Sequence, residues 1–324
     1  MKRNRTFLSI LLLILSSVVF AADPKIAQPS KKDSSVVEYK NVTMVSGIEF
    51  RWINNAGFEI ILPNGKHVLI DPWLDSAKTW FKSTLSVEKD LDRADYIVLS
   101  HIHSDHADDV GLIQKKFPNV RIFVGALSAE YLIKWQNLNM NKIYLCNDGQ
   151  TFQFDDVTIK VFAGRHTEGA RGNFLKVGKD GFVDTQTIGS MELFNFLITA
   201  SDGTKVMVWA GTPSEDLVYS LKGTNPDVAV MHVSPKQDFD MFGRLVASMN
   251  AKIVIPHHYD IWESLFEKNP EMKKDSPLPP EQVTVPNILG IFRKSIEKGS
   301  PQTYFFIPEN HKWYHLGLGV VPSK

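Results

Sequence analysis

The stretch SHIHSDH, Ser100–His106, places three histidines and an aspartate within six positions. It directly follows the apolar run Tyr96–Leu99, which is typical of a short buried strand. Imidazole and carboxylate groups are the ligands that zinc and similar divalent cations prefer. A chain with only 10 histidines among 324 residues is not expected to gather three of them here by chance. The stretch therefore predicts a metal site at the end of a strand, with four candidate ligands: His101, His103, Asp105 and His106.

Strands and helices are expected on both sides of this stretch. Two hairpins are predicted, with strands 58–62 and 67–70 around Pro63–Gly65 and strands 194–199 and 205–209 around Asp202–Gly203. Further strands are expected at 96–99, 121–124, 142–145, 157–162, 227–233, 252–255 and 303–307, and helices at 108–116, 128–135, 239–249 and 287–298. Asp108 is a candidate cap of the first helix. Residues 167–190 carry five glycines and are expected to form one long loop.

This mixture of hairpins and interleaved helices predicts an α+β fold. Two sheets are expected to pack face to face with helices outside them, as a four-layer αβ/βα sandwich. Hydrophobic residues make up 43% of the chain and charged residues 22%, which suits a globular protein with a buried core. When the three basic residues of the N-terminal leader (Lys2, Arg3 and Arg5) are left out, the chain has 33 basic and 36 acidic residues. That balance gives no reason to expect nucleic-acid binding.

The N-terminus has the pattern of a secretory signal peptide. Three basic residues precede the apolar run Phe7–Phe20, and Ala21 and Ala22 follow it. A signal peptide 1–21, a flexible lead-in 22–45 and one folded domain 46–324 are expected, with cleavage after Ala21 or Ala22. An uncleaved anchor is the alternative, although the run is short for a membrane span. The expected location is outside the cytoplasm, periplasmic in a Gram-negative bacterium, with no stable membrane insertion once the leader is removed. Cys146 is the only cysteine, so no intrachain disulfide is possible.

At this point the chain resembles the metallo-β-lactamase superfamily, over roughly residues 50–310. HIHSDH matches the family signature HxHxDH, Asp71 follows a strand as in its first motif, and His166 fits the third-motif histidine. His258 fits the last motif; the adjacent His257 is a rival, but the family's Pro-x-His-Tyr pattern selects His258. The strings AGFEI, LIDPWL and PHHY look most like the branch that includes ascorbate-6-phosphate lactonases and N-acylphosphatidylethanolamine phospholipases D.

The resemblance implies one or two divalent metal ions, zinc foremost, with manganese or iron also compatible. The first metal would be bound by His101, His103 and His166, and the second by Asp105, His106 and His258. Asp71 would orient a ligand histidine, and Asp105 would also handle the proton of the attacking water.

One departure concerns the fourth motif, where the family has a bridging aspartate and this chain has Thr212. A hydroxyl is a far weaker ligand than a carboxylate, so the second site is expected to be weak, empty or differently ligated. Glu215 or Asp216 could reach in from the following turn, or could cap the next helix.

The implied function is hydrolysis of a lactone, ester or phosphodiester bond in a small-molecule substrate. A β-lactam hydrolase is one alternative, and a non-catalytic metal-binding protein with a degraded second site is another. Trp73, Trp80 and Phe81 could form an apolar wall of the active site or pack into the core. His232 could touch substrate or be structural, and Arg165 and Arg171 could bind an anion or be solvated. The sequence leaves the oligomeric state open.

Overall fold

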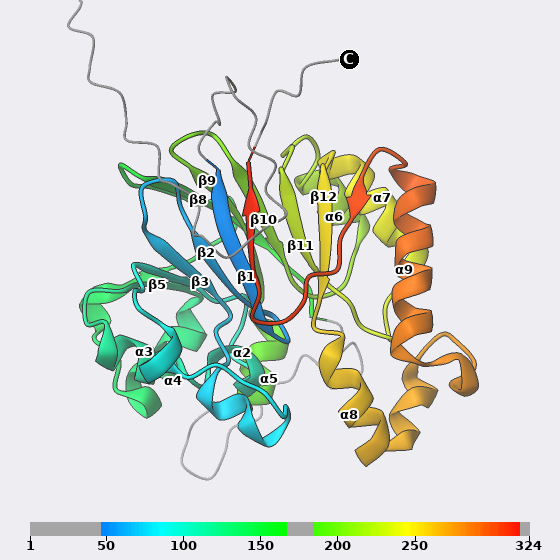
Figure 1. Ribbon diagram of the computed structural model, residues 1–324, viewed down its shortest axis with the longest axis horizontal. Helices are drawn as coiled ribbons and strands as arrows, with labels where there is room; N and C mark the ends of the chain where they lie inside the picture. Colours follow the sequence, from blue (N-terminus) through cyan, green and yellow to red (C-terminus); the bar gives the residue numbers. More distant parts are fainter. Residues whose placement is uncertain (1–46, 167–184, 318–324) are drawn as a thin grey trace, which may run out of the picture. The chain divides into compact units, whose positions relative to one another are not determined.

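A computed structural model of the protein describes residues 47–166 and 185–317. Its first sheet has seven strands in the order β14-β1-β2-β3-β4-β5-β6. Figure 1 shows β1, β2 and β3 of this sheet side by side. The two hairpin pairs β1–β2 and β2–β3 are antiparallel, whereas β3 to β6 run parallel. The strands are β1 (Ile48–Asn54), β2 (Gly57–Ile61), β3 (His67–Ile70), β4 (Tyr96–Val98), β5 (Arg121–Val124), β6 (Ile143–Leu145) and β14 (Trp313–Leu316).

The second sheet also has seven strands, in the order β13-β12-β11-β10-β9-β8-β7. Here β7 to β10 pair antiparallel and β10 to β13 pair parallel, so both predicted hairpins are confirmed. The strands are β7 (Thr151–Gln153), β8 (Val157–Ala163), β9 (Phe194–Ala200), β10 (Lys205–Trp209), β11 (Val228–His232), β12 (Ile253–His257) and β13 (Tyr304–Phe305).

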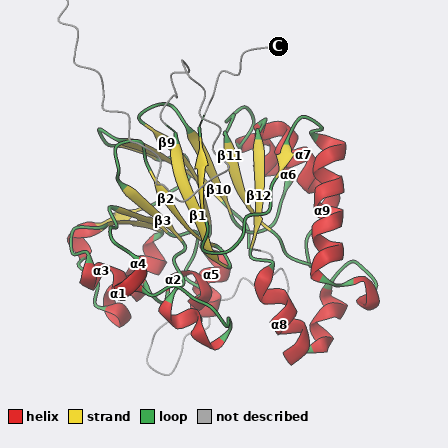
Figure 2. Ribbon diagram, viewed as in Figure 1, coloured by secondary structure: helices red, strands yellow, loops and turns green. Residues whose placement is uncertain are grey.

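The two sheets bury one core between them and one core on each outer face. Alternate residues of one strand point to opposite faces, and β4 shows the result: Tyr96 and Val98 enter the core between the sheets, whereas Ile97 packs on the outer face with α3 and α4. On the other outer face, Phe242 of α7 and Phe292 of α9 cover β10 to β12. Figure 2 shows the resulting order of helix, strand, strand and helix layers. The predicted four-layer sandwich is confirmed.

The observed helices agree with the helices predicted from the sequence in position more than in length. They are α1 (Val87–Asp90), α2 (Ser104–Ala107), α3 (Val110–Lys116), α4 (Ala126–Gln136), α5 (Thr185–Met191), α6 (Glu215–Ser220), α7 (Phe239–Met249), α8 (Asp260–Lys268) and α9 (Val285–Gly299). Short 3-10 turns are η1 (Asp75–Thr79), η2 (Met140–Lys142), η3 (Pro270–Asp275) and η4 (Pro280–Gln282). Among the described residues, no helix combines the length and apolar character that crossing a bilayer requires.

Two local predictions are wrong. Asp108 does not cap a helix 108–116: it ends α2, and α3 begins only after Asp109, whose carboxylate accepts hydrogen bonds from the Leu74 and Ser76 amides instead. The long loop predicted for 167–190 is also too long, because Thr185–Met191 forms α5. Residues 167–184 lie outside the described part of the chain, as do the leader and the lead-in.

Candidate metal centre

Two groups of three metal-binding side chains meet at one edge of the sandwich. His101, His103 and His166 form the first group, and Asp105, His106 and His258 form the second; within each group the donor atoms all lie within 4.8 Å of one another. The structure thus brings together all six residues that the sequence analysis assigned as ligands. They come from the ends of β4, β8 and β12, three strands that are distant in sequence and belong to both sheets.

The first group is built around the turn that joins β4 to α2. His101 and His103 lie in this turn, with His101 Nε2 3.0 Å from His103 Nδ1, so these two nitrogens face the same point. His166 comes from the other sheet, and its ring centroid lies 5.0 Å from that of His101 and 4.7 Å from that of His103. Three imidazoles therefore surround a single position.

The second group is held together by hydrogen bonds to Asp105. Its Oδ2 lies 3.1 Å from His258 Nε2 and accepts a 2.9 Å hydrogen bond from Asn55 Nδ2. His258 has a φ of 67°, a left-handed conformation that is uncommon for residues other than glycine. The His258 amide donates to the Asn55 carbonyl at 2.8 Å, so one residue of the β1–β2 turn fixes both partners.

Asp71, just after β3, orients one histidine of each group. Its Oδ2 lies 2.9 Å from His106 Nδ1 and 2.5 Å from Ser100 Oγ, and Ser100 Oγ in turn lies 2.9 Å from His101 Nδ1. When Nδ1 of an imidazole is held by such an acceptor, the ring is fixed in the tautomer that presents the Nε2 lone pair to a metal. This is the supporting contact that the sequence analysis expected of Asp71.

The electrostatics of both groups suit a cation. Burial, reinforced by the neighbouring histidines, holds the pKa of His101 well below its usual value and lowers the pKa of His166 to about 3. These rings are therefore neutral, which is the form in which an imidazole binds a metal. Burial alone would raise the pKa of Asp105, but His106 and His258 hold it low, so its carboxylate is charged. Burial alone would lower the pKa of His106, but Asp105 and Asp71 instead raise it. Imidazoles and one carboxylate are the donor set of a borderline divalent cation, and the residues fit one.

The fourth-motif position does not supply a carboxylate. Gly211 and Ala210 line the pocket at this point, whereas Thr212 is not among the lining residues, and its amide donates to the Arg165 carbonyl at 2.7 Å. Gly211 has a φ of 90° and packs so closely on that carbonyl that no side chain would fit.

The two acidic residues beyond Thr212 do not replace the missing carboxylate. Glu215 pairs with Arg244 at 2.7 Å on the surface, and Asp216 is exposed. Ser214, rather than either acid, caps α6.

Two further histidines occupy different positions at the edge of the site. His257 is buried, its Nε2 lies 3.2 Å from the Trp209 carbonyl, and it joins neither group, so the choice of His258 over His257 agrees with the geometry. His232 lines the pocket, and its ring lies 4.5 Å from that of His258.

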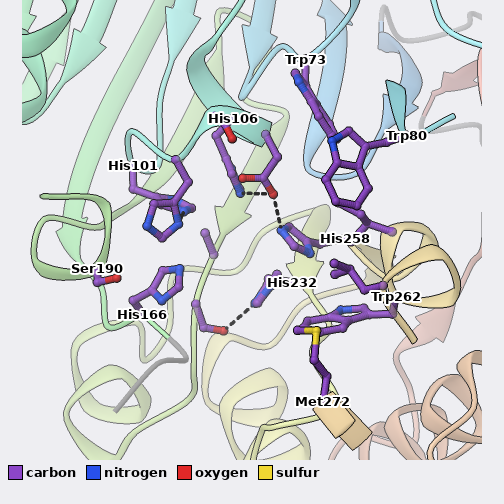
Figure 3. A pocket seen from close by; sticks show the side chains of 17 residues that line it. Trp73, Trp80, His101, His106, His166, Ser190, His232, His258, Trp262 and Met272 are labelled. Carbon is purple, nitrogen blue, oxygen red and sulfur yellow. Dashed lines mark hydrogen bonds and ion pairs between the residues drawn. The ribbon is translucent and has the colours of Figure 1, made fainter. Parts of the chain in front are cut away.

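The two groups form the floor of a pocket of about 280 Å³. Figure 3 shows the histidines on one side of it and Trp73, Trp80, Trp262 and Met272 on the other. Trp73 is buried yet lines the pocket, so the wall and core interpretations both apply to it. Phe81 is not a lining residue; its ring packs edge-on against Trp73, at 5.7 Å between centroids. The Arg165 side chain is exposed away from the lining, and Arg171 falls outside the described residues.

Three contributors were not found from the sequence. Asn55 holds Asp105, Trp262 of α8 adds to the apolar wall, and Gly189 of α5 packs against the His103 ring. Asn54–Asn55 between two strands is a turn signal, which says nothing of where the side chain reaches. Helix α8 follows the PHHY string directly and was not predicted as a helix.

A model of the β-lactamase superfamily domain matches residues 66–259, more than half of the chain. The chain belongs to the β-lactamase superfamily. A superfamily relative from Methanobrevibacter smithii, named a UPF0173 metal-dependent hydrolase, is 24% identical over 229 residues, which cover 69% of this chain and 87% of the relative. A second of the same name, from Koribacter versatilis, is 22% identical and covers 71% and 92%.

Solved structures confirm the metallo-β-lactamase fold of this superfamily member. Igni18, a metallo hydrolase from Ignicoccus hospitalis, superposes with a TM-score of 0.54 at 15% identity, over 85% of this chain and 99% of that one. CmlA, a diiron β-hydroxylase from Streptomyces venezuelae, superposes with a TM-score of 0.53 at 11% identity, over 85% of this chain and 55% of that one. Because a hydrolase and a hydroxylase share the fold, this likeness shows the fold alone.

Proposed function

We propose that the protein is an exported metal-dependent hydrolase that cleaves a neutral carboxylic ester or lactone carrying an apolar group. The observation that carries the proposal is the pair of converging donor groups on the floor of a pocket with an aromatic wall. The names of the two relatives, both metal-dependent hydrolases, agree with it. Of the branch suggested by the sequence strings, the lactonase chemistry is part of this proposal and the phosphodiester chemistry of a phospholipase D is not.

The first metal is held by His101, His103 and His166, and the second by Asp105, His106 and His258. Zinc is the proposed ion because imidazole dominates both groups, although manganese and iron accept the same donors. A divalent ion bound there supplies a water molecule of lowered pKa and polarises the oxygen of the bond to be cleaved.

Asp105 is the proposed proton carrier. Its Oδ2 is held by Asn55 and His258, so the carboxylate has one fixed orientation toward the pocket. A carboxylate in hydrogen-bond reach of the attacking water accepts its proton and then passes it to the leaving oxygen. Asp71 contributes by keeping His101 and His106 in place and touches no reacting atom.

The aromatic wall of the pocket favours a neutral, apolar substrate over a phosphodiester. Of the described residues that line the pocket, none is lysine or arginine, the residues that usually pair with a phosphate. Six apolar side chains instead form one side: Trp73, Trp80, Ile261, Trp262, Leu265 and Met272. Nothing in this lining favours a β-lactam ring over other cyclic esters and amides.

The decisive experiment replaces His103 with alanine. Losing a ligand of the first metal is expected to lower the bound metal and to reduce kcat/KM on p-nitrophenyl esters by on the order of 10³-fold, since a metal provides several kcal/mol of stabilisation to the transition state. Unchanged metal content and turnover would refute the proposal.

Substrate class is tested with matched substrates. The wild-type enzyme is expected to prefer p-nitrophenyl octanoate to the acetate and to leave bis(p-nitrophenyl) phosphate nearly untouched. Trp80→Ala is the control: it should keep the metal but lose about tenfold in kcat/KM on the octanoate, the loss expected when an apolar contact is removed. Faster phosphodiester than ester hydrolysis would contradict the proposed substrate.

Export is proposed from the leader 1–21 and is tested separately. Mass spectrometry of the protein from its native host should find a mature chain that begins at Ala22 or Asp23. An N-terminus that retains residues 1–21 would contradict export by cleavage.

A further inference from the structure

His232 lines the pocket but belongs to neither group of converging donors. It is the last residue of β11, the strand between β10, which leads to Thr212, and β12, which leads to His258. Its side chain is buried, at 6% exposure, and its ring meets that of His258 edge to face at 86°. His232 is thus a buried histidine next to the proposed ligand His258. It lies on the side where the fourth-motif carboxylate is missing, which suggests that it has a role at the metal.

The Nδ1 atom of His232 is anchored away from the pocket. It lies 3.0 Å from the Gly211 carbonyl oxygen, to which its N–H donates, while Gln237 Nε2, a second donor to the same oxygen, lies 3.0 Å from Nδ1. Gln237 is itself fixed, because its Oε1 accepts from the Ser234 amide at 2.9 Å and its Nε2 donates to the same Gly211 carbonyl. With Nδ1–H donating to that carbonyl, Nε2 carries the lone pair, and Figure 3 shows the His232 ring next to that of His258.

This arrangement repeats that of two proposed ligands. His106 Nδ1 is held by Asp71 and His101 Nδ1 by Ser100, in each case leaving Nε2 to the metal. Ligand histidines almost always give their other ring N–H to a carboxylate, carbonyl or similar acceptor. For His232 the acceptor is the carbonyl of Gly211, the residue just before the position where the superfamily's bridging carboxylate was expected.

We propose that His232 ligates the second metal through Nε2 and so supplies the donor that Thr212 does not. The second site then has the ligands Asp105, His106, His258 and His232, with a short approach of the His232 ring on metal binding. This inference rests on the metal dependence proposed above, but it is independent of the substrate.

Metal titration of the metal-free protein tests the proposal without any turnover measurement. Calorimetry with Zn²⁺ and absorption spectroscopy with Co²⁺ are expected to show two sites per chain. In His232→Ala the first site should stay, whereas the second should weaken by more than ~100-fold and its Co²⁺ spectrum should change. Gln237→Leu is the matched control: it keeps the imidazole, so the second site should weaken only by ~10–100-fold, the effect of losing a contact to a ligand.

A rescue variant strengthens the test. Thr212→Asp in the His232→Ala background is expected to restore the second site, since a carboxylate returns to the position from which it is missing. Circular dichroism checks folding, and His232→Gln replaces His232→Ala if the latter unfolds. Two undiminished sites in His232→Ala, or a single site in the wild type, would overturn the inference. Absence of ester hydrolysis with both sites intact would instead count against the proposed function alone.

Discussion

Asp71 links residues of both donor groups through a single carboxylate. One oxygen accepts the Ser100 amide at 2.7 Å, and the other contacts His106 and Ser100 Oγ. Its backbone has a φ of 39°, a left-handed conformation that aspartate and asparagine tolerate better than other side chains. An asparagine at this position therefore tests the charge without straining the backbone.

Asp71→Asn is expected to weaken metal binding at both groups by ~10–100-fold, because the acceptor that fixes the His106 tautomer is lost. Metal titration measures the change, and far-ultraviolet circular dichroism should show an unaltered fold. Equal metal affinity in the variant and the wild type would mean that Asp71 has only a structural role.

At the residue scale the sequence was most informative about side chains that carry recognisable chemistry. The cluster at 101–106 was assigned from residue type and spacing. His166 and His258 were assigned because they follow strands and fit motifs of the metallo-β-lactamase superfamily. Asn55 and Gln237 carry no such signal, because their roles depend on which distant group they meet after folding, Asp105 for Asn55 and the Gly211 carbonyl for Gln237. The same holds for the anchoring of His232.

Helix α5 supports the first donor group by close packing. A Cβ atom on Gly189 would lie 2.7 Å from His103 Nε2, well inside contact distance. The helix cannot retreat easily, because Ile188 is buried in the outer core and the Glu192 carboxylate accepts from the Ser128 amide of α4 at 2.8 Å. An added methyl group must therefore displace the His103 ring.

Gly189→Ala is expected to weaken metal binding by at least about tenfold through this displacement. Gly290→Ala is the matched control, since Gly290 also lies in a helix and a Cβ there meets nothing within 4 Å. The control should bind metal normally and gain ~0.5–1 kcal/mol in free energy of unfolding, the usual benefit of alanine over glycine in a helix. Metal titration and urea unfolding give the two readouts, and normal metal binding by Gly189→Ala would show that the ring position is not critical.

The positions of strands and helices with a clear hydrophobic period were predicted well, whereas the residues at which they begin and end were not. The hairpins at 58–70 and 194–209 follow from alternation and turn residues, which are local properties. The start of α3 depends on the Asp109 carboxylate, which bonds to the loop after β3 rather than to its own helix. Such long-range competition between partners is invisible in the local sequence.

At the scale of the whole molecule, Asp156 ties the two sheets together. Asp156 lies in the turn that leads into β8 of the second sheet. Its carboxylate accepts a 2.8 Å hydrogen bond from the Tyr96 hydroxyl of the first sheet and pairs with Lys66 at 3.2 Å. Burial alone would raise the pKa of Asp156, but the hydrogen bonds from Tyr96 and Lys66 outweigh it and lower the pKa below its usual value. The stability contributed by this charge is thus present above about pH 4 and is lost as the pH falls through the lowered pKa.

Asp156→Asn is expected to lower the free energy of unfolding by ~1.5–3 kcal/mol at pH 7, the range for hydrogen bonds to a charged group. The difference from the wild type should shrink as the pH falls below about 4, where the wild-type carboxylate also gains a proton. Asp155→Asn is the control, because Asp155 is exposed and should leave stability unchanged. Urea unfolding across this pH range checks the prediction, and a constant difference at all pH values would contradict it.

The pairing of β14 with β1 has a consequence for how the chain folds as it is synthesised. β1 contributes Ile48, Phe50 and Trp52 to the core. Within residues 47–166 and 185–317, its outer hydrogen-bonding edge pairs with Trp313–Leu316 and, at Trp52, with Asn310 and His311. A ribosome therefore releases the first sheet long before it releases the strand that closes it. Until then an apolar strand edge is open to pairing with other nascent chains. Aggregation during translation is thus an expected penalty of truncating or mutating this last strand.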